Sequence, residues 1–189
     1  MNDLLLLAMM LDEPKYGYQL KREAGWIMGE GALHNNLVYP LLRRFLDDGW
    51  VSKKAVPGER GQTRQQYALT AEGRRTLFER LHQFTEFDAR SEHAFSLRVG
   101  LFAALKPEIR ESILTARENY LQKRERNLAG LQDKMDLGKF GSEIVRHMRR
   151  QIAMETEWVH HLRRIVKTGD VRKVIPEKTV LSPNRNGAL

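Results

Sequence analysis

The sequence predicts a mostly α-helical protein with a small β-hairpin, in which a compact N-terminal domain precedes a domain of long helices. In residues 1–80, short apolar segments are separated by turn-forming residues. Residues 81–167 are charged and favour helix, with breaks at Pro107 and around Gly138 and Gly141. We therefore expect two domains, 1–80 and 81–167, followed by a flexible tail over 168–189.

The composition excludes several classes of protein. The 189 residues contain no cysteine, which removes disulfides, thiolate metal sites and cysteine nucleophiles. The longest apolar run, residues 4–11, is much shorter than the ~20 residues that cross a bilayer, so we expect a cytoplasmic protein without a membrane partner. The glycine motifs of phosphate and dinucleotide sites, the Gly-x-Ser-x-Gly elbow and histidine pairs at i and i+4 are missing too. The sequence thus predicts no enzyme, no metal site and no cofactor.

Three helices are predicted before residue 50. The first covers residues 4–11, and the second starts near residue 16 and buries either Tyr18 or Leu20. The third starts at Asn35 or Asn36, whose side chains can accept hydrogen bonds from the free amides of its first turn. It ends at Gly49, because glycine readily adopts the positive φ of a helix C-terminus.

After Gly49 the apolar pattern changes to that of strands. Residues 50–55 and 65–69 are expected to form a β-hairpin through the turn-rich segment 57–61. Thr70 then caps a helix that carries Leu77, Leu81 and Phe84 on one face. Three helices, a hairpin and a further helix, in this order, are the layout of a winged helix-turn-helix domain.

Charge favours a polyanionic partner. Lysine and arginine number 32 against 24 acidic residues, a formal net charge of +8. Between residues 43 and 75 there are eight cations and four anions, so the third helix and the hairpin are locally basic by 8 − 4 = +4. This excess makes double-stranded DNA a candidate partner.

The third helix and the hairpin carry the predicted DNA contacts. The N-terminal part of such a helix enters the major groove, where amides and phenols reach base edges, and a hairpin tip follows the backbone or enters the minor groove. The residues assigned to DNA binding are Tyr16, Lys21, His34, Asn35, Asn36, Tyr39, Arg43, Arg44, Lys53, Arg60, Gln62, Thr63 and Arg64. Taken singly, each of these residues is better explained as a solvated polar group on a small domain, and the DNA-binding interpretation rests on their convergence on one helix and one wing.

Three motifs in the first 75 residues resemble those of a known family. They are Tyr16-Gly17-Tyr18-Gln19-Leu20, Val38-Tyr39-Pro40-Leu41-Leu42-Arg43-Arg44 with its continuation to Gly49-Trp50-Val51, and Gly61-Gln62-Thr63-Arg64-Gln65-Gln66-Tyr67-Ala68-Leu69-Thr70-Ala71-Glu72-Gly73. Together they resemble the PadR family of bacterial transcriptional regulators, in the branch with a long, AphA-like helical C-terminal domain. The resemblance implies a dimer in which Tyr39 and the wing residues near Arg64 face DNA. The family commonly has Gly followed by Thr or Ser where this sequence has Asn36-Leu37, so we expect Asn36 to replace that hydroxyl as cap or donor.

The C-terminal half contains two apolar stripes with the spacing of a coiled-coil seam. One stripe runs from Val145 to Val166 and is interrupted by Glu155, and the other runs from Leu114 to Met135. Because two helices alone bury little surface, we expect a second copy of the chain to complete the layer. The residues assigned to dimerisation are Leu77, Leu81, Phe84, Leu121, Leu128, Met148, Ile152, Val159 and Leu162.

Glu155 and Trp158 allow two interpretations. They could line an effector pocket between the helices, since ligand sites in bundles combine an aromatic side chain with few polar groups. Equally, Trp158 packs and Glu155 fixes the register of the seam.

These observations favour a homodimeric, sequence-specific transcriptional regulator that acts as a repressor on a palindromic operator and responds to a small-molecule effector. Two alternatives stay open. One is a sensor of aromatic or multidrug ligands with its site between the C-terminal helices. The other is a helical adaptor that binds only protein.

Overall fold

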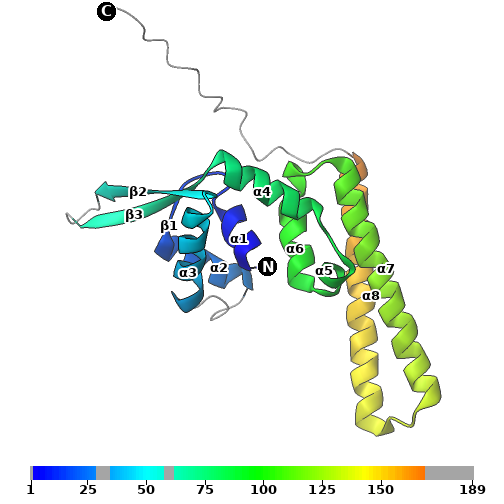
Figure 1. Ribbon diagram of the computed structural model, residues 1–189. Coiled ribbons are helices and arrows are strands. Elements are labelled where there is room, and N and C mark those ends of the chain that lie inside the picture. The colour runs from blue at the N-terminus through cyan, green and yellow to red at the C-terminus, as the bar shows by residue number, and fades with distance from the viewer. Residues whose placement is uncertain (1, 29–34, 58–61, 169–189) are drawn as a thin grey trace, which may run out of the picture.

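The computed structural model describes residues 2–28, 35–57 and 62–168, which form an elongated molecule (Figure 1). The N-terminal domain contains α1 (Asn2–Met9), β1 (Lys15–Tyr16), α2 (Gly17–Met28), α3 (Asn35–Asp47), β2 (Val51–Pro57), β3 (Thr63–Leu69) and α4 (Ala71–His82). The predicted helices and hairpin are confirmed. The structure adds the strand β1, which at two residues is too short to produce a periodic pattern.

The hairpin β2–β3 extends away from the body of the domain beside α3 (Figure 1). The sheet is antiparallel with the order β1-β3-β2. Below it, Leu6, Leu20, Phe45 and Leu77 from four different helices are fully buried, and this apolar contact holds the domain together. Of the two candidates in α2, Leu20 is the buried residue and Tyr18 is exposed.

Thr70 and Gly73 join the hairpin to α4. The Thr70 hydroxyl accepts from the Gly73 amide at 3.0 Å and donates to the Gly49 carbonyl at 2.7 Å, so it caps α4 and fixes the end of α3. A Cβ atom on Gly73 would lie 1.9 Å from the carbonyl oxygen of Trp50. This close approach explains physically why the wing is followed by Thr-x-x-Gly.

The C-terminal half contains α5 (Glu86–Arg90), α6 (Glu92–Gly100), the short 3-10 helix η1 (Phe102–Ala104), α7 (Pro107–Lys134) and α8 (Gly138–Thr168). The predicted breaks at Pro107 and Gly138 are confirmed, but the segment between α4 and α7 is not one helix. Thr85 and Ser91 each start a new helix by capping it, Thr85 through a reciprocal capping box with Asp88. Phe84 therefore lies after the end of α4 and not on it, although it still packs against the core.

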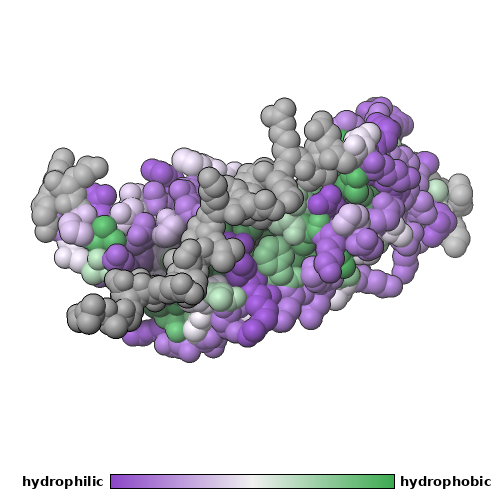
Figure 2. All heavy atoms as spheres, turned by 90° about the horizontal axis from the view of Figure 1, so that it is seen from above, coloured by the Kyte–Doolittle hydropathy of each residue, from purple (hydrophilic) through white to green (hydrophobic). Residues whose placement is uncertain are grey.

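The long helices α7 and α8 lie antiparallel, side by side (Figure 1). Their predicted stripes pack against each other, with Val145, Ile152 and Val159 of α8 and Leu121 of α7 buried between them. None of the described helices is long and apolar enough to cross a membrane. Seen from above, the surface over the long helices is mainly hydrophilic, and hydrophobic atoms gather nearer the middle of that face (Figure 2).

The residues that sequence analysis assigned to dimerisation pack within one subunit. Leu77, Leu81, Leu121, Ile152 and Val159 are buried in the single chain, whereas Phe84, Leu128, Met148 and Leu162 are half-buried. The physical reason for the residues of the long helices is that α7 and α8 cover each other's stripes, whereas Leu77 and Leu81 of α4 belong to the hydrophobic core. These side chains leave little surface for a second copy, and the dimer itself stays a prediction. The predicted tail lies outside the described residues, apart from Thr168 at the end of α8.

Candidate nucleic-acid interface

The exposed face of α3 presents Tyr39 and Arg43. They are four residues apart, so their side chains lie next to each other on the helix. Tyr39 is 47% exposed, and Arg43 is exposed as well. Together with Pro40, Arg44 and Asp47 they line a shallow, open depression. A phenol beside a guanidinium offers hydrogen bonds both to base edges and to phosphates.

The Tyr39 ring lies over the first turn of α2 and near Tyr67 of strand β3. A Cβ atom on Gly17 would lie 3.0 Å from Cε1 of Tyr39, so the ring lies directly over the start of α2. On β3, burial raises the pKa of Tyr67, and the nearby Tyr39 raises it further. The Tyr39 ring therefore contacts a glycine on one helix and lies near a buried tyrosine of the wing, which restricts its orientation.

The strand register divides the wing residues between two faces. Lys53 is opposite Tyr67, so both side chains lie on the face that is turned toward α3. Val56 is opposite Arg64, which places Arg64 on the other face of the hairpin. Gln62 and Thr63 are exposed at the start of β3. Of the predicted wing cations, Lys53 and Arg64 thus lie on different faces of the hairpin.

Several basic residues near α3 have structural partners. Arg44 Nη2 lies 3.4 Å from Oδ2 of Asp3 on α1, and its guanidinium also lies over the ring of Phe45. Arg80 Nη1 lies 2.6 Å from the same Asp3 oxygen. Arg74 donates to the Leu11 carbonyl at 2.9 Å. The local charge excess therefore serves partly to hold α1 against α3 and α4.

The remaining predicted contacts are spread around this face. Tyr16, on β1, stacks on Tyr18 with ring centroids 5.8 Å apart, and Lys21 is exposed on α2. Asn35 and Asn36 form the first turn of α3, as predicted. His34 and Arg60 lie outside the described residues. Sequence analysis omitted Tyr18 and Tyr67, although both stand in the motifs that carried the family resemblance.

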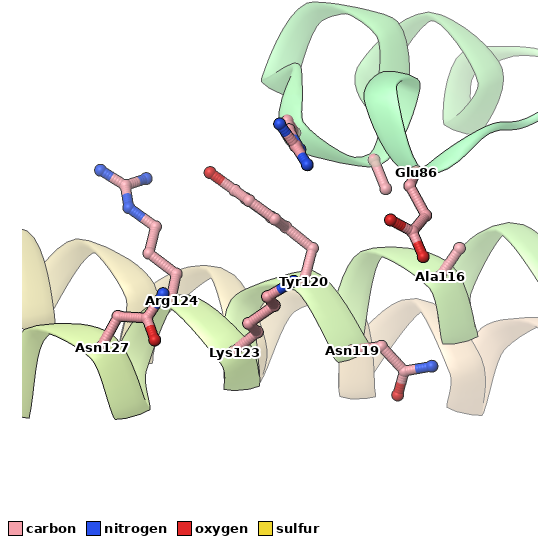
Figure 3. Close-up of a pocket in the computed structure, with 9 residues that line it drawn as sticks. Glu86, Ala116, Asn119, Tyr120, Lys123, Arg124 and Asn127 are labelled. Carbon is pink, nitrogen blue, oxygen red and sulfur yellow. The ribbon is translucent and has the colours of Figure 1, made fainter.

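A cavity lies between α5 and α7, and Glu155 and Trp158 do not line it. Glu155 pairs with Arg117, and Trp158 lies edge-on to Phe95 with ring centroids 5.5 Å apart. The cavity has a volume of about 540 Å³, and Tyr120 and Arg124 project from α7 into it, toward α5 (Figure 3). Its lining consists of Glu86, Ala89, Arg90, Ala116, Asn119, Tyr120, Lys123, Arg124 and Asn127.

A helix-turn-helix followed by a two-stranded wing defines the class of winged helix DNA-binding proteins. Residues 6–79, which cover this domain, match the model of the "Transcriptional regulator PadR-like family". Over residues 6–79 the chain is therefore similar to the PadR-like family of transcriptional regulators, and the predicted resemblance is confirmed for these residues. Members of this family regulate transcription and are not enzymes.

Comparison with solved structures finds several transcriptional regulators among the matches. A PadR-like transcription factor from Bacteroides fragilis is 25% identical over 41% of this chain and 73% of that chain, with a TM-score of 0.38. The protein smu.1704 from Streptococcus mutans is 24% identical over 41% and 70%, also with a TM-score of 0.38. Bacillus subtilis PadR in complex with operator DNA is 15% identical over 87% and 98%, with a TM-score of 0.44. No curated protein sequence matches the chain.

Proposed function

We propose that the protein is a homodimeric transcriptional repressor that binds a palindromic, double-stranded operator through α3 and the wing. The observation that carries this proposal is the pair Tyr39 and Arg43, exposed together on α3 of a PadR-family domain. Lys53 lies on the wing face turned toward the same helix. These three side chains come from two elements that can enter or border one groove.

The chemistry of each residue suggests its role. With the start of α3 in the major groove, Asn35 and Asn36 come close to base edges, where an amide pairs bidentately with adenine. Tyr39 and Arg43, one and two turns further along, reach the edge of the groove and the phosphates. Lys53 and the exposed end of the hairpin bind the backbone, which positions the domain without reading sequence.

A two-fold symmetric dimer would read two half-sites. Such half-sites lie about one helical turn, ~34–36 Å, or a multiple of it apart, so the operator is expected to be palindromic. Occupation of a promoter by such a dimer blocks transcription, which is why we propose repression.

Footprinting on the DNA upstream of the protein's own gene, together with selection from random duplexes, tests this function. We expect a protected palindrome whose binding weakens steeply with salt. Arg43→Ala should weaken binding, whereas Arg126→Ala, which removes an exposed arginine from α7, should not. The absence of any selected or protected sequence would overturn the proposal in favour of a protein-binding adaptor.

The cavity between α5 and α7 supports the proposed response to an effector. Arg90, Lys123 and Arg124 outnumber the single carboxylate of Glu86, and Tyr120 supplies an aromatic face (Figure 3). We infer that the effector is a small anion with an apolar body, because cations and hydrogen-bonding groups then satisfy its charge while the ring packs against it.

Titration calorimetry with p-coumaric acid, the compound bound in one structure of Bacillus subtilis PadR, is a suitable first probe. We expect binding that Arg124→Ala weakens and that Glu155→Gln leaves unchanged. Binding lost with Glu155→Gln and kept with Arg124→Ala would move the site back to the residues predicted from sequence. If neither p-coumaric acid nor a panel of aromatic acids binds, the effector site is rejected.

A further inference from the structure

A smaller cavity lies where the N-terminal domain meets the C-terminal helices, and we call it the junction cavity. Its volume is about 400 Å³, which is within the range of small-molecule sites. Residues of α1, α5 and α6 and of the end of α4, the helix that leads from the wing to the C-terminal half, form its walls (Figure 1). Six residues line it: Asp3, Leu4, Arg80, Gln83, Asp88 and Arg98. None of them lines the cavity between α5 and α7, so the two cavities are separate.

Arg98 is a buried charge in the wall of the junction cavity, because it is only 4% exposed. Its Nη1 atom donates to the Ala94 carbonyl at 3.1 Å, and its Nη2 atom donates to the Gln83 carbonyl at 2.9 Å. Its Nε atom is buried and has no hydrogen-bond partner within the part of the chain that the structure describes. Burial lowers the pKa of Arg98, and the nearby Asp88 offsets this only in part. A buried charge is costly unless it is fully paired, so this guanidinium needs a further acceptor.

Asp88 places a carboxylate beside this guanidinium. Its Oδ2 atom lies 3.7 Å from Nη2 of Arg98, which is too long for a hydrogen bond. The same Oδ2 atom accepts from the amide and from the hydroxyl of Thr85, at 3.0 Å and 2.9 Å, in the capping box of α5. This leaves the Oδ1 atom of Asp88 for a donor from outside the helix, and the carboxylate is 27% exposed. Gln83 adds an exposed amide, which can both accept and donate.

The charges of the lining determine which ligand fits. Two guanidiniums, of Arg80 and Arg98, face two carboxylates, of Asp3 and Asp88. A simple anion would meet two like charges in this cavity, and so would a simple cation. A zwitterion finds an opposite charge for each of its own. Because the charges of Arg98 and Asp88 are only 3.7 Å apart, the two charges of the ligand must also lie close together. An α-amino acid meets this condition, since its ammonium and carboxylate groups are bonded to the same carbon.

We propose that the junction cavity binds a free α-amino acid. The carboxylate of the ligand accepts from the N–H groups of Arg98 that have no other acceptor, and such charge-assisted hydrogen bonds are strong. The ammonium group donates to Oδ1 of Asp88 and to the amide oxygen of Gln83. Leu4 is the one apolar residue among the six of the lining, so the side chain of the ligand is small or aliphatic. The ligand thereby connects the end of α4 to α5 and α6 at the junction of the two domains.

Differential scanning fluorimetry with each of the common L-amino acids in turn tests the class of ligand. A ligand that binds only the folded chain raises the melting temperature as its concentration increases. We expect this rise for at least one amino acid with a small or aliphatic side chain. If no amino acid raises the melting temperature, the proposal is overturned.

Three relatives of the amino acid that binds are matched controls. The N-acetyl derivative lacks the ammonium charge, the amide lacks the carboxylate charge, and the isomer with its amino group at the end of the carbon chain separates the two charges. None of the three should raise the melting temperature. An N-acetyl derivative or an amide that acts as strongly as the amino acid would show a site for a simple anion or a simple cation. An equally active isomer would show that the spacing of the charges is irrelevant, and each of these results overturns the proposal.

Titration calorimetry of variants with the same amino acid tests the location. Asp88→Asn removes a charge and keeps the shape of the side chain, so it should raise the dissociation constant about tenfold or more. Gln83→Ala should raise it by less, because the main-chain carbonyl that accepts from Arg98 remains. Arg98→Met should abolish binding, whereas Arg75→Met, which removes an exposed arginine of α4 outside the cavity, should leave it unchanged.

Binding that survives both Asp88→Asn and Arg98→Met would place the ligand elsewhere and overturn the proposal. If Arg98→Met fails to fold, wild-type affinity in both Asp88→Asn and Gln83→Ala overturns it alone, since neither of these side chains is buried. The measurements use neither DNA nor p-coumaric acid, so their outcome is independent of the proposed function.

Discussion

The guanidinium of Arg117 on α7 and the carboxylate of Glu155 on α8 form an ion pair in which Nε and Nη2 lie 2.7 Å and 2.5 Å from the same Oε1 atom. Arg117 is almost completely buried. Its Nη1 atom donates to the Ala89 carbonyl of α5, and its guanidinium lies 5.5 Å from the ring centroid of Phe95 on α6. One side chain thus joins four helices at the point where the DNA-binding domain is attached to the long helices.

Removal of one partner of this pair should be strongly destabilising. We expect Arg117→Met to lower the free energy of unfolding by about 3–5 kcal/mol, because Glu155 is left without its buried partner. The double variant Arg117→Met, Glu155→Leu should recover much of that loss, since no uncompensated charge remains. Urea unfolding followed by circular dichroism measures each value.

An exposed ion pair of the same long helices provides the control. Arg146 and Glu143 pair on the surface of α8, with each side chain about half exposed. Arg146→Met should therefore change the free energy of unfolding by about 1 kcal/mol or less. If Arg117→Met and Arg146→Met lowered the free energy of unfolding equally, burial would not explain how much Arg117 stabilises the protein.

Glu155 illustrates what the sequence reveals and what it omits. Its position in the seam of α8 is visible from the spacing alone, and both a ligand site and a register role were compatible with it. The partner, Arg117, lies 38 residues earlier on another helix. No local pattern in the sequence connects the two residues. Only the packing of α7 against α8 shows that Glu155 pairs with Arg117 and does not line a ligand site.

The seam of α8 left a similar choice open. The spacing of Val145, Ile152 and Val159 correctly predicts a buried seam, but a seam does not say whether α7 or a second copy covers it. In the N-terminal domain the elements were predictable, because caps and turns such as Thr70 and Gly49 are local signals.

Gly73 is expected to tolerate no side chain. Gly73→Ala should destabilise the protein by about 1–3 kcal/mol, because its Cβ atom would overlap the Trp50 carbonyl and force α4 away from the wing. Gly25→Ala, inside α2 with open space around it, should be neutral or stabilising by up to about 1 kcal/mol. The melting temperatures of both variants measure these effects. A Gly73→Ala variant as stable as the wild type would contradict the close approach of Gly73 to the Trp50 carbonyl.

Acid should weaken the contact between α7 and α8 through Glu118. Hydrogen bonds from His160 and then from Arg163 hold the pKa of Glu118 below its ordinary value of 4.5. A carboxyl whose pKa is lower in the folded state stabilises the protein above its unfolded pKa, and this stabilisation is lost as the pH falls through the folded pKa. The difference in melting temperature between wild type and Glu118→Gln should therefore be largest near neutral pH and shrink below about pH 4.5. A difference in melting temperature that persists at acid pH would exclude this role for Glu118.

The salt dependence of operator binding distinguishes the phosphate contacts of the wing from bystander charges. Lys53 and Arg64 lie on opposite faces of the hairpin, and a wing that enters a groove has a DNA backbone on both sides. Each of Lys53→Ala and Arg64→Ala should therefore reduce the slope of log K against log salt by about one. Arg126→Ala on α7 should leave the slope unchanged. Fluorescence anisotropy at several salt concentrations provides the slopes. If Arg64→Ala leaves the slope unchanged while Lys53→Ala reduces it, the phosphate contacts of the wing are restricted to the face turned toward α3.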